Sequence, residues 1–173
     1  MDLDTIVSAE NLQSPGGSGG RRFTSKQMGD ACEMLVAAEL TLAGIPALKV
    51  PDNWPHYDVI AQPVGAAAQR ISVKSRTFKR GAAFVDYKAE DLFDWLAIVI
   101  LSGEAAAERQ VYMVPKAVAD HHARRDKPTS KTASQRYYRI DEVERLFGAF
   151  RGNFALDAEP AAQTTGQALE PER

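Results

Sequence analysis

Residues 57–76, "YDVIAQPVGAAAQRISVKSR", contain two short apolar segments that each carry one charged residue at a defined place. In the second segment, apolar and polar side chains alternate in the order Ile71, Ser72, Val73, Lys74. This period of two predicts a β-strand with one apolar and one polar face, and the side chains of Ser72 and Lys74 would lie roughly 6.6 Å apart on the polar face. Asp58 begins the first segment, and residues 62–69 would join the two segments as a hairpin. The sequence therefore predicts a carboxylate and an ammonium group close together at one edge of a sheet.

The composition excludes several classes of protein. A single cysteine, Cys32, allows neither an internal disulfide nor a zinc site built from cysteines. The longest apolar run, "WLAIVIL" at 95–101, is much shorter than the ~20 residues that a membrane-spanning helix needs. The first residues, "MDLD", are acidic where a signal peptide is basic. We therefore expect a cytoplasmic protein that does not contact the membrane.

The net charge of −2 is unevenly distributed. Residues 1–20 hold three acids and no base, and residues 156–173 hold four acids and one base, so residues 21–155 carry +4. The bases fall mainly in two groups, Arg70, Lys74, Arg76, Lys79, Arg80 and, later, Arg124, Arg125, Lys127, Lys131, Arg136, Arg139. A basic core of this kind suits a polyanionic partner, although a solvated surface has the same composition.

The remaining pattern predicts one mixed α/β domain. "TSKQ" at 24–27 is a capping box, and apolar residues at helical spacing follow it up to Gly44, which predicts the end of a helix. Strands are predicted at 45–50, 57–61, 70–76, 95–101 and 109–115, and short helices at 87–94, 116–123 and 141–150, the last with Asp141 and Glu144 as a capping pair. The order α-β-β-β-α-β-β-α indicates a mixed central sheet flanked by helices. We expect this domain to span 23–155, between disordered acidic tails at 1–22, which is also rich in Gly and Ser, and 156–173.

Four short motifs follow one another along this order: Gly29-x-x-x-Glu33 in the first helix, Asp58 at the start of a strand, an apolar-x-Val-Lys segment that ends at Lys74, and "VYMVP" at 111–115 after a central strand. In this order and topology they resemble the PD-(D/E)xK nuclease superfamily, and most of all its small endonuclease and Holliday-junction-resolvase-like members. The resemblance covers about half of the chain and implies a restriction-endonuclease-like fold. From the sequence, Gly29 is expected to let the helix approach the sheet closely.

The resemblance implies a metal-dependent nuclease that hydrolyses phosphodiester bonds in DNA. Asp58 would be the principal ligand of Mg²⁺ or Mn²⁺, the backbone carbonyl of Val73 a second ligand, and Glu33 would support the metal or its waters. Lys74 would orient the attacking water or neutralise the phosphate. Resolvase-like members are commonly homodimers, and the residues expected to grip DNA phosphates here are Arg76, Lys79 and Arg80.

Ser72 departs from the family pattern, which has Glu, Asp or often Gln at this catalytic position. A hydroxyl is a poorer ligand for Mg²⁺ than a carboxylate. Either Glu33 or Asp86 supplies the missing charge, or the site binds metal weakly, or the chain is a degenerate module that binds nucleic acid without cutting it. Asp52, in the literal "PD" at 51–52, is an alternative to Asp58 as the ligand. An unrelated small α/β protein with a coincidental "SVK" is the remaining interpretation.

Overall fold

The computed structural model describes residues 23–77, 84–101 and 109–160. Its centre is a five-stranded sheet in the order β1-β2-β3-β5-β6. The strands are β1 (Ala47–Lys49), β2 (Val59–Ala61), β3 (Gln69–Thr77), β5 (Trp95–Leu101) and β6 (Arg109–Pro115). Strands β3 and β5 are parallel, and the other neighbouring strands of this sheet are antiparallel. The predicted fold class, a single mixed α/β domain with a mixed central sheet flanked by helices, is confirmed.

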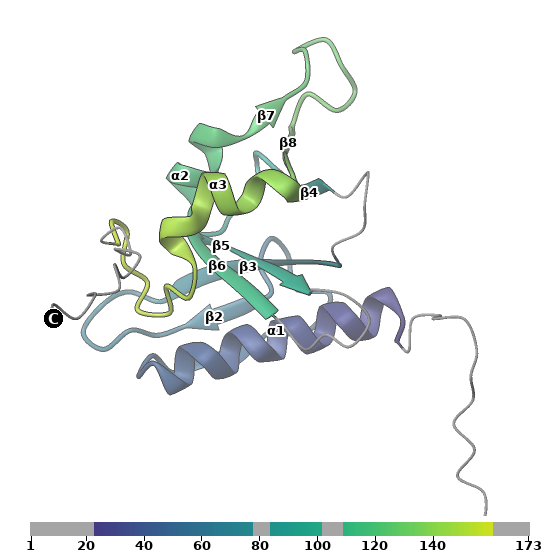
Figure 1. Ribbon diagram of the computed structural model, residues 1–173. Helices are drawn as coiled ribbons and strands as arrows, with labels where there is room; N and C mark the ends of the chain where they lie inside the picture. The colour runs from purple at the N-terminus through teal and green to yellow at the C-terminus, as the bar shows by residue number, and fades with distance from the viewer. Residues whose placement is uncertain (1–22, 78–83, 102–108, 161–173) are drawn as a thin grey trace, which may run out of the picture.

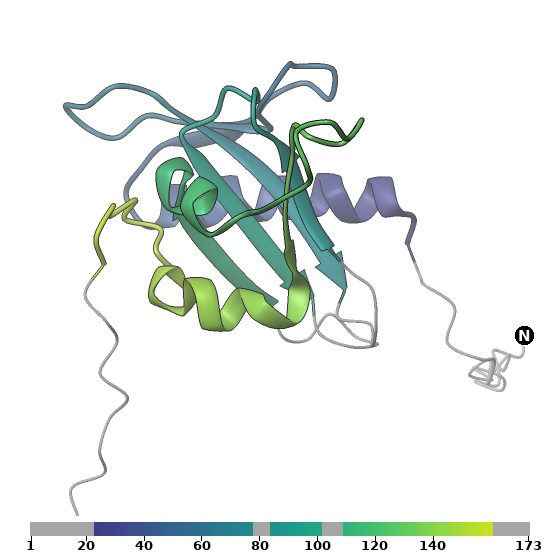
Figure 2. The same ribbon diagram turned by 90° about the horizontal axis from the view of Figure 1, so that it is seen from above.

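Helix α1 (Ser25–Leu42) covers one face of this sheet (Figures 1 and 2). The predicted capping box begins it: the Thr24 hydroxyl accepts a hydrogen bond from the Gln27 amide at 3.1 Å, and the Gln27 side chain accepts one from the Thr24 amide at 2.9 Å. The helix ends at Leu42, two residues before Gly44, whose φ of +91° suits glycine. The buried side of α1 packs on one face of the sheet through Cys32, Val36, Ala37 and Leu40.

The other face of the sheet is covered by α2 (Lys116–His122), α3 (Val143–Phe147) and a second, three-stranded sheet (Figures 1 and 2). The second sheet has the order β4-β8-β7, with β4 (Phe84–Lys88), β7 (Arg124–Arg125) and β8 (Gln135–Arg139). Strand β5 lies between the two apolar layers, and all of its residues are buried. The uninterrupted apolar run of β5 suits this position, because both faces of a strand between two apolar layers are buried.

The prediction of a short helix at 87–94 is wrong. Tyr87 and Lys88 end strand β4, and a turn follows, in which the Asp91 carboxylate accepts a hydrogen bond from the Lys88 amide at 3.0 Å. Residues 84–88 alternate between exposed and buried side chains, which is the pattern of a strand at a half-covered face. Strands β7 and β8, which lie between the helices predicted at 116–123 and 141–150, were likewise not predicted.

The helix predicted at 141–150 is present only in pieces. A 3₁₀ turn, η1 (Ile140–Glu142), precedes α3, and a second 3₁₀ turn, η2 (Gly148–Phe150), follows it. The predicted capping pair is wrong: the Asp141 carboxylate binds the Arg139 guanidinium, and the Glu144 carboxylate accepts a hydrogen bond from the Tyr112 hydroxyl. Within the described ranges, no helix combines the length and the apolar character that crossing a membrane requires.

Candidate metal site at the edge of β3

Asp58 lies directly before β2, where its backbone amide donates to the Ile71 carbonyl of β3 at 2.9 Å. Its carboxylate Oδ2 accepts hydrogen bonds from the Val73 amide at 2.6 Å and from the Ser72 hydroxyl at 3.4 Å. In an extended strand the amide and carbonyl of one residue point to the same side, so the Val73 carbonyl also points to the side on which Asp58 lies. The β2–β3 pairing therefore places the Asp58 carboxylate beside the Val73 backbone carbonyl at the start of β2.

Three further carboxylates gather close to Asp58. Asp30 and Glu33 come from α1, and Asp52 from the turn after β1; one oxygen from each lies within 4.8 Å of the others. All four acids line one open pocket of about 310 Å³. Its complete lining is Lys26, Gly29, Asp30, Glu33, Val50, Pro51, Asp52 and Asp58.

Two lysines compensate this negative charge. The Lys49 ammonium lies 2.6 Å from a carboxylate oxygen of Glu33, 2.6 Å from one of Asp52, and 3.5 Å from one of Asp30. Lys26 binds Asp30 and Asp52 from the solvent side. Hydrogen bonds to Asp52 and then to Glu33 raise the pKa of Lys49, and hydrogen bonds from Lys26 and Lys49 lower the pKa of Asp52 to about 2. Both lysines and Asp52 therefore stay charged across the physiological range.

Glu33 behaves differently from its neighbour Asp52. Burial raises the pKa of the Glu33 carboxyl, and this effect outweighs the opposing hydrogen bond from Lys49. The nearby charge of Asp58 raises the pKa further. An ionised carboxylate is therefore held at this position against an unfavourable environment, which is the situation that a bound cation relieves.

Glu33→Gln should increase the stability of the metal-free protein at neutral pH, because it removes a carboxylate whose raised pKa marks its charged form as unfavourable. The gain should shrink as the pH falls through the raised pKa of Glu33 towards 4.5, since wild-type Glu33 then becomes neutral as well. Thermal unfolding of both proteins in EDTA from pH 4 to pH 8 measures the difference. A Tm of the variant that is lower than that of the wild type at pH 7 would contradict this account.

Ser72 and Lys74 face the opposite side of the sheet from α1. They pair with Leu96 and Ile98 of β5, whose side chains belong to the apolar layer under α2 and α3. Ser72 is only 2% exposed, and Lys74 is half-buried. The structure thus brings Asp58, Glu33 and Asp52 together at one pocket, and it brings Ser72 into contact with Asp58. Lys74 lies two residues after Ser72 on β3 and is not among the described residues that line the pocket.

Arg76 and Asp86 bind each other. The Arg76 guanidinium donates to the Phe84 carbonyl at 2.6 Å and to the Asp86 carboxylate at 2.8 Å, and so ties β4 to β3. Asp86 is exposed and belongs to β4, away from the pocket that Asp58 lines, so it is not placed to supply the charge that Ser72 lacks. The two other predicted phosphate-binding residues, Lys79 and Arg80, lie outside the described residues.

Gly29 has a different role from the one expected. A methyl group built at this position meets no atom within 4 Å, so close approach of helix and sheet does not require the glycine. Gly29 lines the acidic pocket instead, where a larger side chain would occupy its volume. Sequence reasoning missed three members of the site, Lys26, Asp30 and Lys49. Asp30 precedes Glu33 by three residues and so shares its helix face, a signal that was available.

The donor set suits a hard divalent cation. Mg²⁺ and Mn²⁺ prefer oxygen ligands, and this pocket offers carboxylates from α1, from the turn after β1 and from the start of β2, together with the Val73 carbonyl nearby. Ser72 adds a hydroxyl in contact with Asp58, not a charge. The residues present therefore fit a metal of this class, with the charge coming from α1, the turn after β1 and the start of β2, and not from β3.

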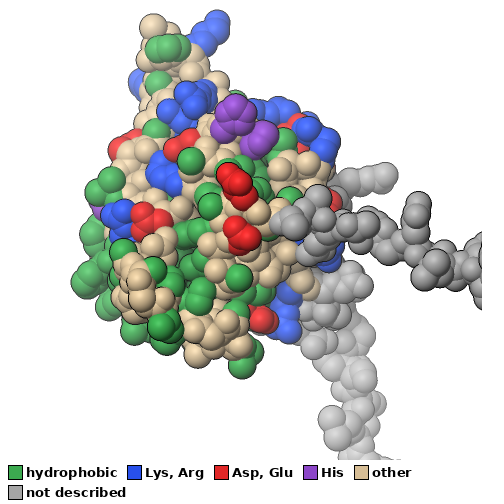
Figure 3. Space-filling model, turned by 90° about the vertical axis from the view of Figure 1, so that its left-hand side faces the viewer, with side chains coloured by type: hydrophobic (Ala, Val, Ile, Leu, Met, Phe, Trp, Pro, Cys, Tyr) green, Lys and Arg blue, Asp and Glu red, His purple; other side chains and the backbone are tan. Residues whose placement is uncertain are grey.

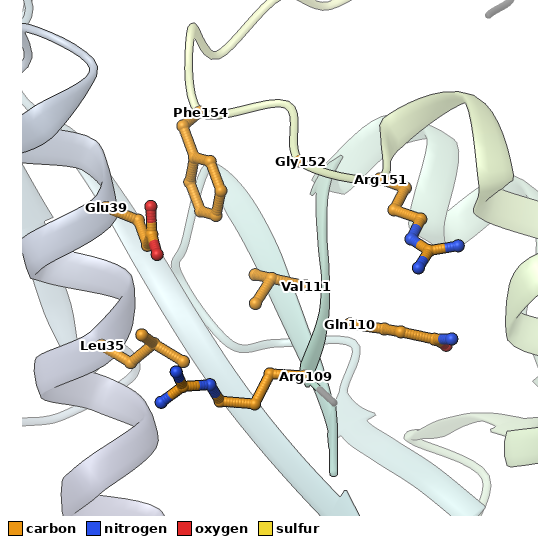
Figure 4. Close-up of a pocket in the computed structure, with 8 residues that line it drawn as sticks. All are labelled: Leu35, Glu39, Arg109, Gln110, Val111, Arg151, Gly152 and Phe154. Carbon is orange, nitrogen blue, oxygen red and sulfur yellow. The ribbon is translucent and has the colours of Figure 1, made fainter. Parts of the chain in front are cut away.

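A larger pocket of about 630 Å³ lies between the C-terminal half of α1 and strand β6. Figure 4 shows Arg109 pointing towards α1, Arg151 pointing away from it, and Glu39 on the helix side. Glu39 is the one carboxylate among its described lining residues, so this pocket lacks the clustered acids that metal-assisted hydrolysis needs.

No protein-family model matches the sequence, and no curated protein matches it either. Among solved structures, the fold is similar to that of I-Ssp6803I, a bacterial homing endonuclease, with 21% sequence identity and a TM-score of 0.49 over 78% of this chain and 93% of that one. It is also similar to Hjc, a Holliday junction resolvase from the archaeal hyperthermophile Archaeoglobus fulgidus, with 13% identity and a TM-score of 0.41 over 66% of this chain and 90% of that one. Neither likeness by itself assigns an activity to this chain.

Proposed function

We propose that this chain is a metal-dependent nuclease of the PD-(D/E)xK type that hydrolyses phosphodiester bonds in DNA. The observation that carries the proposal is the position of Asp58. Its carboxylate is fixed by the Val73 amide at the edge of β3 and opens into a pocket that it shares with Glu33 and Asp52. Four carboxylates around one pocket, one of them with a raised pKa, favour a cation over an anionic ligand.

Asp58, Glu33 and the Val73 carbonyl would hold Mg²⁺ or Mn²⁺, with Asp30 and Asp52 close enough to bind its waters. The metal, when bound, would lower the pKa of a water and neutralise charge on the phosphate. Without the metal, the positive charges of Lys49 and Lys26 compensate the ionised acids, so that these acids can lie close together in the folded chain. Their ammonium groups are mobile on long side chains and can move towards solvent or towards the phosphate of a substrate.

Lys74 would act on the substrate side. The lysine lies on the same strand face as Ser72, which contacts Asp58, so its extended side chain can reach towards a phosphate held near Asp58. A compact ammonium group is suited to orient a water or to neutralise a phosphate oxygen. Its half-buried position beside the apolar layer restricts the directions in which the side chain can extend.

One observation favours a second candidate, a module that binds nucleic acid without cutting it. Ser72 is buried and donates its hydroxyl to Asp58, so one oxygen of the main proposed ligand is already occupied by neutral donors. A hydroxyl at this position is a poorer ligand for Mg²⁺ than the carboxylate of the family pattern, so the site would bind Mg²⁺ more weakly. This candidate predicts DNA binding that EDTA does not change.

Purified protein with Mg²⁺ or Mn²⁺ should nick or cut plasmid or branched DNA, and Lys74→Met should abolish the activity because it keeps the side-chain length and removes the ammonium group. Lys74→Arg is the matched control, which keeps the charge and should retain part of the activity. Gel assays with both metals and with EDTA measure this. Equal cleavage by Lys74→Met and the wild type would refute the role of Lys74, and absence of cleavage with tight EDTA-independent binding would favour the second candidate.

A metal titration separates these candidates without an activity assay. Wild-type protein should melt at a higher temperature in Mn²⁺ than in EDTA, since a ligand that binds only the native state stabilises it. Ser72→Glu adds a carboxylate beside Asp58, so it should lower the Tm in EDTA and enlarge the rise that Mn²⁺ produces.

A homodimer stays a prediction, which light scattering coupled to size-exclusion chromatography tests.

A further inference from the structure

Residues 124–139 form an arm that stands away from the rest of the fold (Figure 1). Strands β7 and β8 pair as its two sides, with Arg124 opposite Tyr137 and Arg125 opposite Arg136, and residues 126–134 close it. This basic arm contains six Lys or Arg residues and a single acid, Asp126. Lys and Arg side chains gather on the upper part of the face drawn in Figure 3, the level at which the arm projects.

Four of the six bases have no carboxylate partner among the described residues. Lys127 and Lys131 are exposed, and their side chains make no hydrogen bond or ion pair within the described part of the chain. Arg125 and Arg136 donate only to backbone carbonyls, which orient a guanidinium and leave its charge uncompensated. The two others are paired, Arg124 with Glu142 at 2.6 Å and Arg139 with Asp141 at 2.8 Å.

The arm is held in one conformation by its own contacts. The Asp126 carboxylate accepts hydrogen bonds from the Thr132 hydroxyl and from the Tyr137 hydroxyl, the latter at 3.2 Å, so this acid is engaged inside the arm. At the base of the arm, the Phe84 and Tyr137 rings pack edge to face, with centroids 5.7 Å apart. A surface whose backbone is already ordered loses less entropy when it binds a partner.

The arm belongs to the second sheet, on the opposite face of the central sheet from α1, and contacts link it to the loop before Asp58. The Ala89 amide at the end of β4 donates to the Ser134 carbonyl of the arm at 2.8 Å. Two residues on, Asp91 lies 3.6 Å from the His56 ring, and His56 is two residues before Asp58. A chain of direct contacts thus connects the arm with the loop that carries the proposed metal ligand.

We propose that the basic arm binds the backbone phosphates of duplex DNA beside the site of cleavage. This inference rests on the proposed function and names the surface that holds the substrate. Uncompensated ammonium and guanidinium groups on a preformed ribbon match the closely spaced phosphates of a duplex, and phosphate contacts position a protein without reading the sequence. We choose DNA over an acidic protein as the partner because contacts connect the arm with the loop that carries Asp58, the main ligand of the proposed nuclease site.

The double variant Lys127→Gln/Lys131→Gln tests this surface. Both side chains are exposed and make no contacts that the fold needs, so the variant should fold like the wild type. Its affinity for a short labelled duplex should be about thirtyfold lower at about 0.15 M salt, and the slope of log K against log salt should be smaller by about 2, the effect of losing two phosphate contacts. Fluorescence anisotropy in EDTA measures both quantities without cleavage.

Arg109→Gln/Arg151→Gln is the matched control. It removes two exposed bases from the β6 edge of the molecule and should leave both affinity and slope close to the wild-type values. Unchanged binding by the arm variant, an equal loss in the control, or absence of DNA binding by the wild type would overturn the inference. Wild-type protein that binds DNA through the arm but never cuts it with any metal would refute the proposed function and leave the arm as a DNA-binding surface.

Discussion

Asp58→Asn should lower the rate of metal-dependent DNA cleavage about a thousandfold. Asparagine keeps an oxygen that can accept the hydrogen bond from the Val73 amide, so the strand pairing at this edge should persist. It removes the negative charge on which a divalent cation depends, and a loss of about 4 kcal/mol of transition-state stabilisation corresponds to this factor. Initial rates of plasmid nicking, measured at saturating Mn²⁺ and at limiting Mn²⁺, report the effect on catalysis and on metal affinity separately.

Asp52→Asn is the control that decides between the two candidate ligands. Asp52 lines the same pocket, but it is exposed and its charge is shared with Lys26 and Lys49. We expect its loss to change the rate less than about tenfold, as for a group that does not contact the metal directly. A large loss in Asp52→Asn combined with near-normal activity in Asp58→Asn would show that Asp52 is the principal ligand.

Leu40→Ala should lower the free energy of unfolding by about 3 kcal/mol. Leu40 is completely buried on the sheet side of α1, and its removal leaves a cavity among rigid neighbours, because β-strands of the central sheet form the opposite wall. Because α1 also carries Asp30 and Glu33, loosening this contact should weaken metal binding as well. Urea denaturation monitored by circular dichroism gives the free energy of unfolding.

Leu42→Ala is the matched control on the same helix. Leu42 is 83% exposed, so truncation to alanine should change stability by less than about 0.5 kcal/mol. Similar losses in the two variants would mean that α1 does not pack on the sheet through the face described above. A changed slope of free energy against urea in Leu40→Ala would instead indicate an altered unfolded state.

The parts of the fold that the sequence predicts are those encoded within short segments. The Thr24–Gln27 capping box and helical spacing locate α1, and the apolar run of β5 indicates a strand covered on both sides. Strands β4 and β8 were missed because they are specified by pairing between segments about fifty residues apart. Neither has a long apolar run, so local propensity gives little signal.

The candidate site was predicted only in part for a related reason. The contact of Asp58 with Ser72 follows from hairpin register, which the spacing of the two strands determines. The positions of Lys49 and Asp52 depend on how the chain turns between β1 and β2, and no periodic pattern encodes such a turn. Among the missed residues, Asp30 has a local signal in its helical spacing from Glu33, and Lys26 has one in its helical spacing from Asp30.

The ion pairs of Lys49 affect how the protein should respond to chelators and how the proposed metal would bind. Because the Lys49 ammonium group already lies among the acids as an internal counterion, we expect the chain to fold without a metal, in contrast to small domains that fold only around their ion. Chelators should strip activity and leave a native apoprotein that regains it when the cation is restored. Loading is then an exchange of one positive charge for another, so it should be reversible.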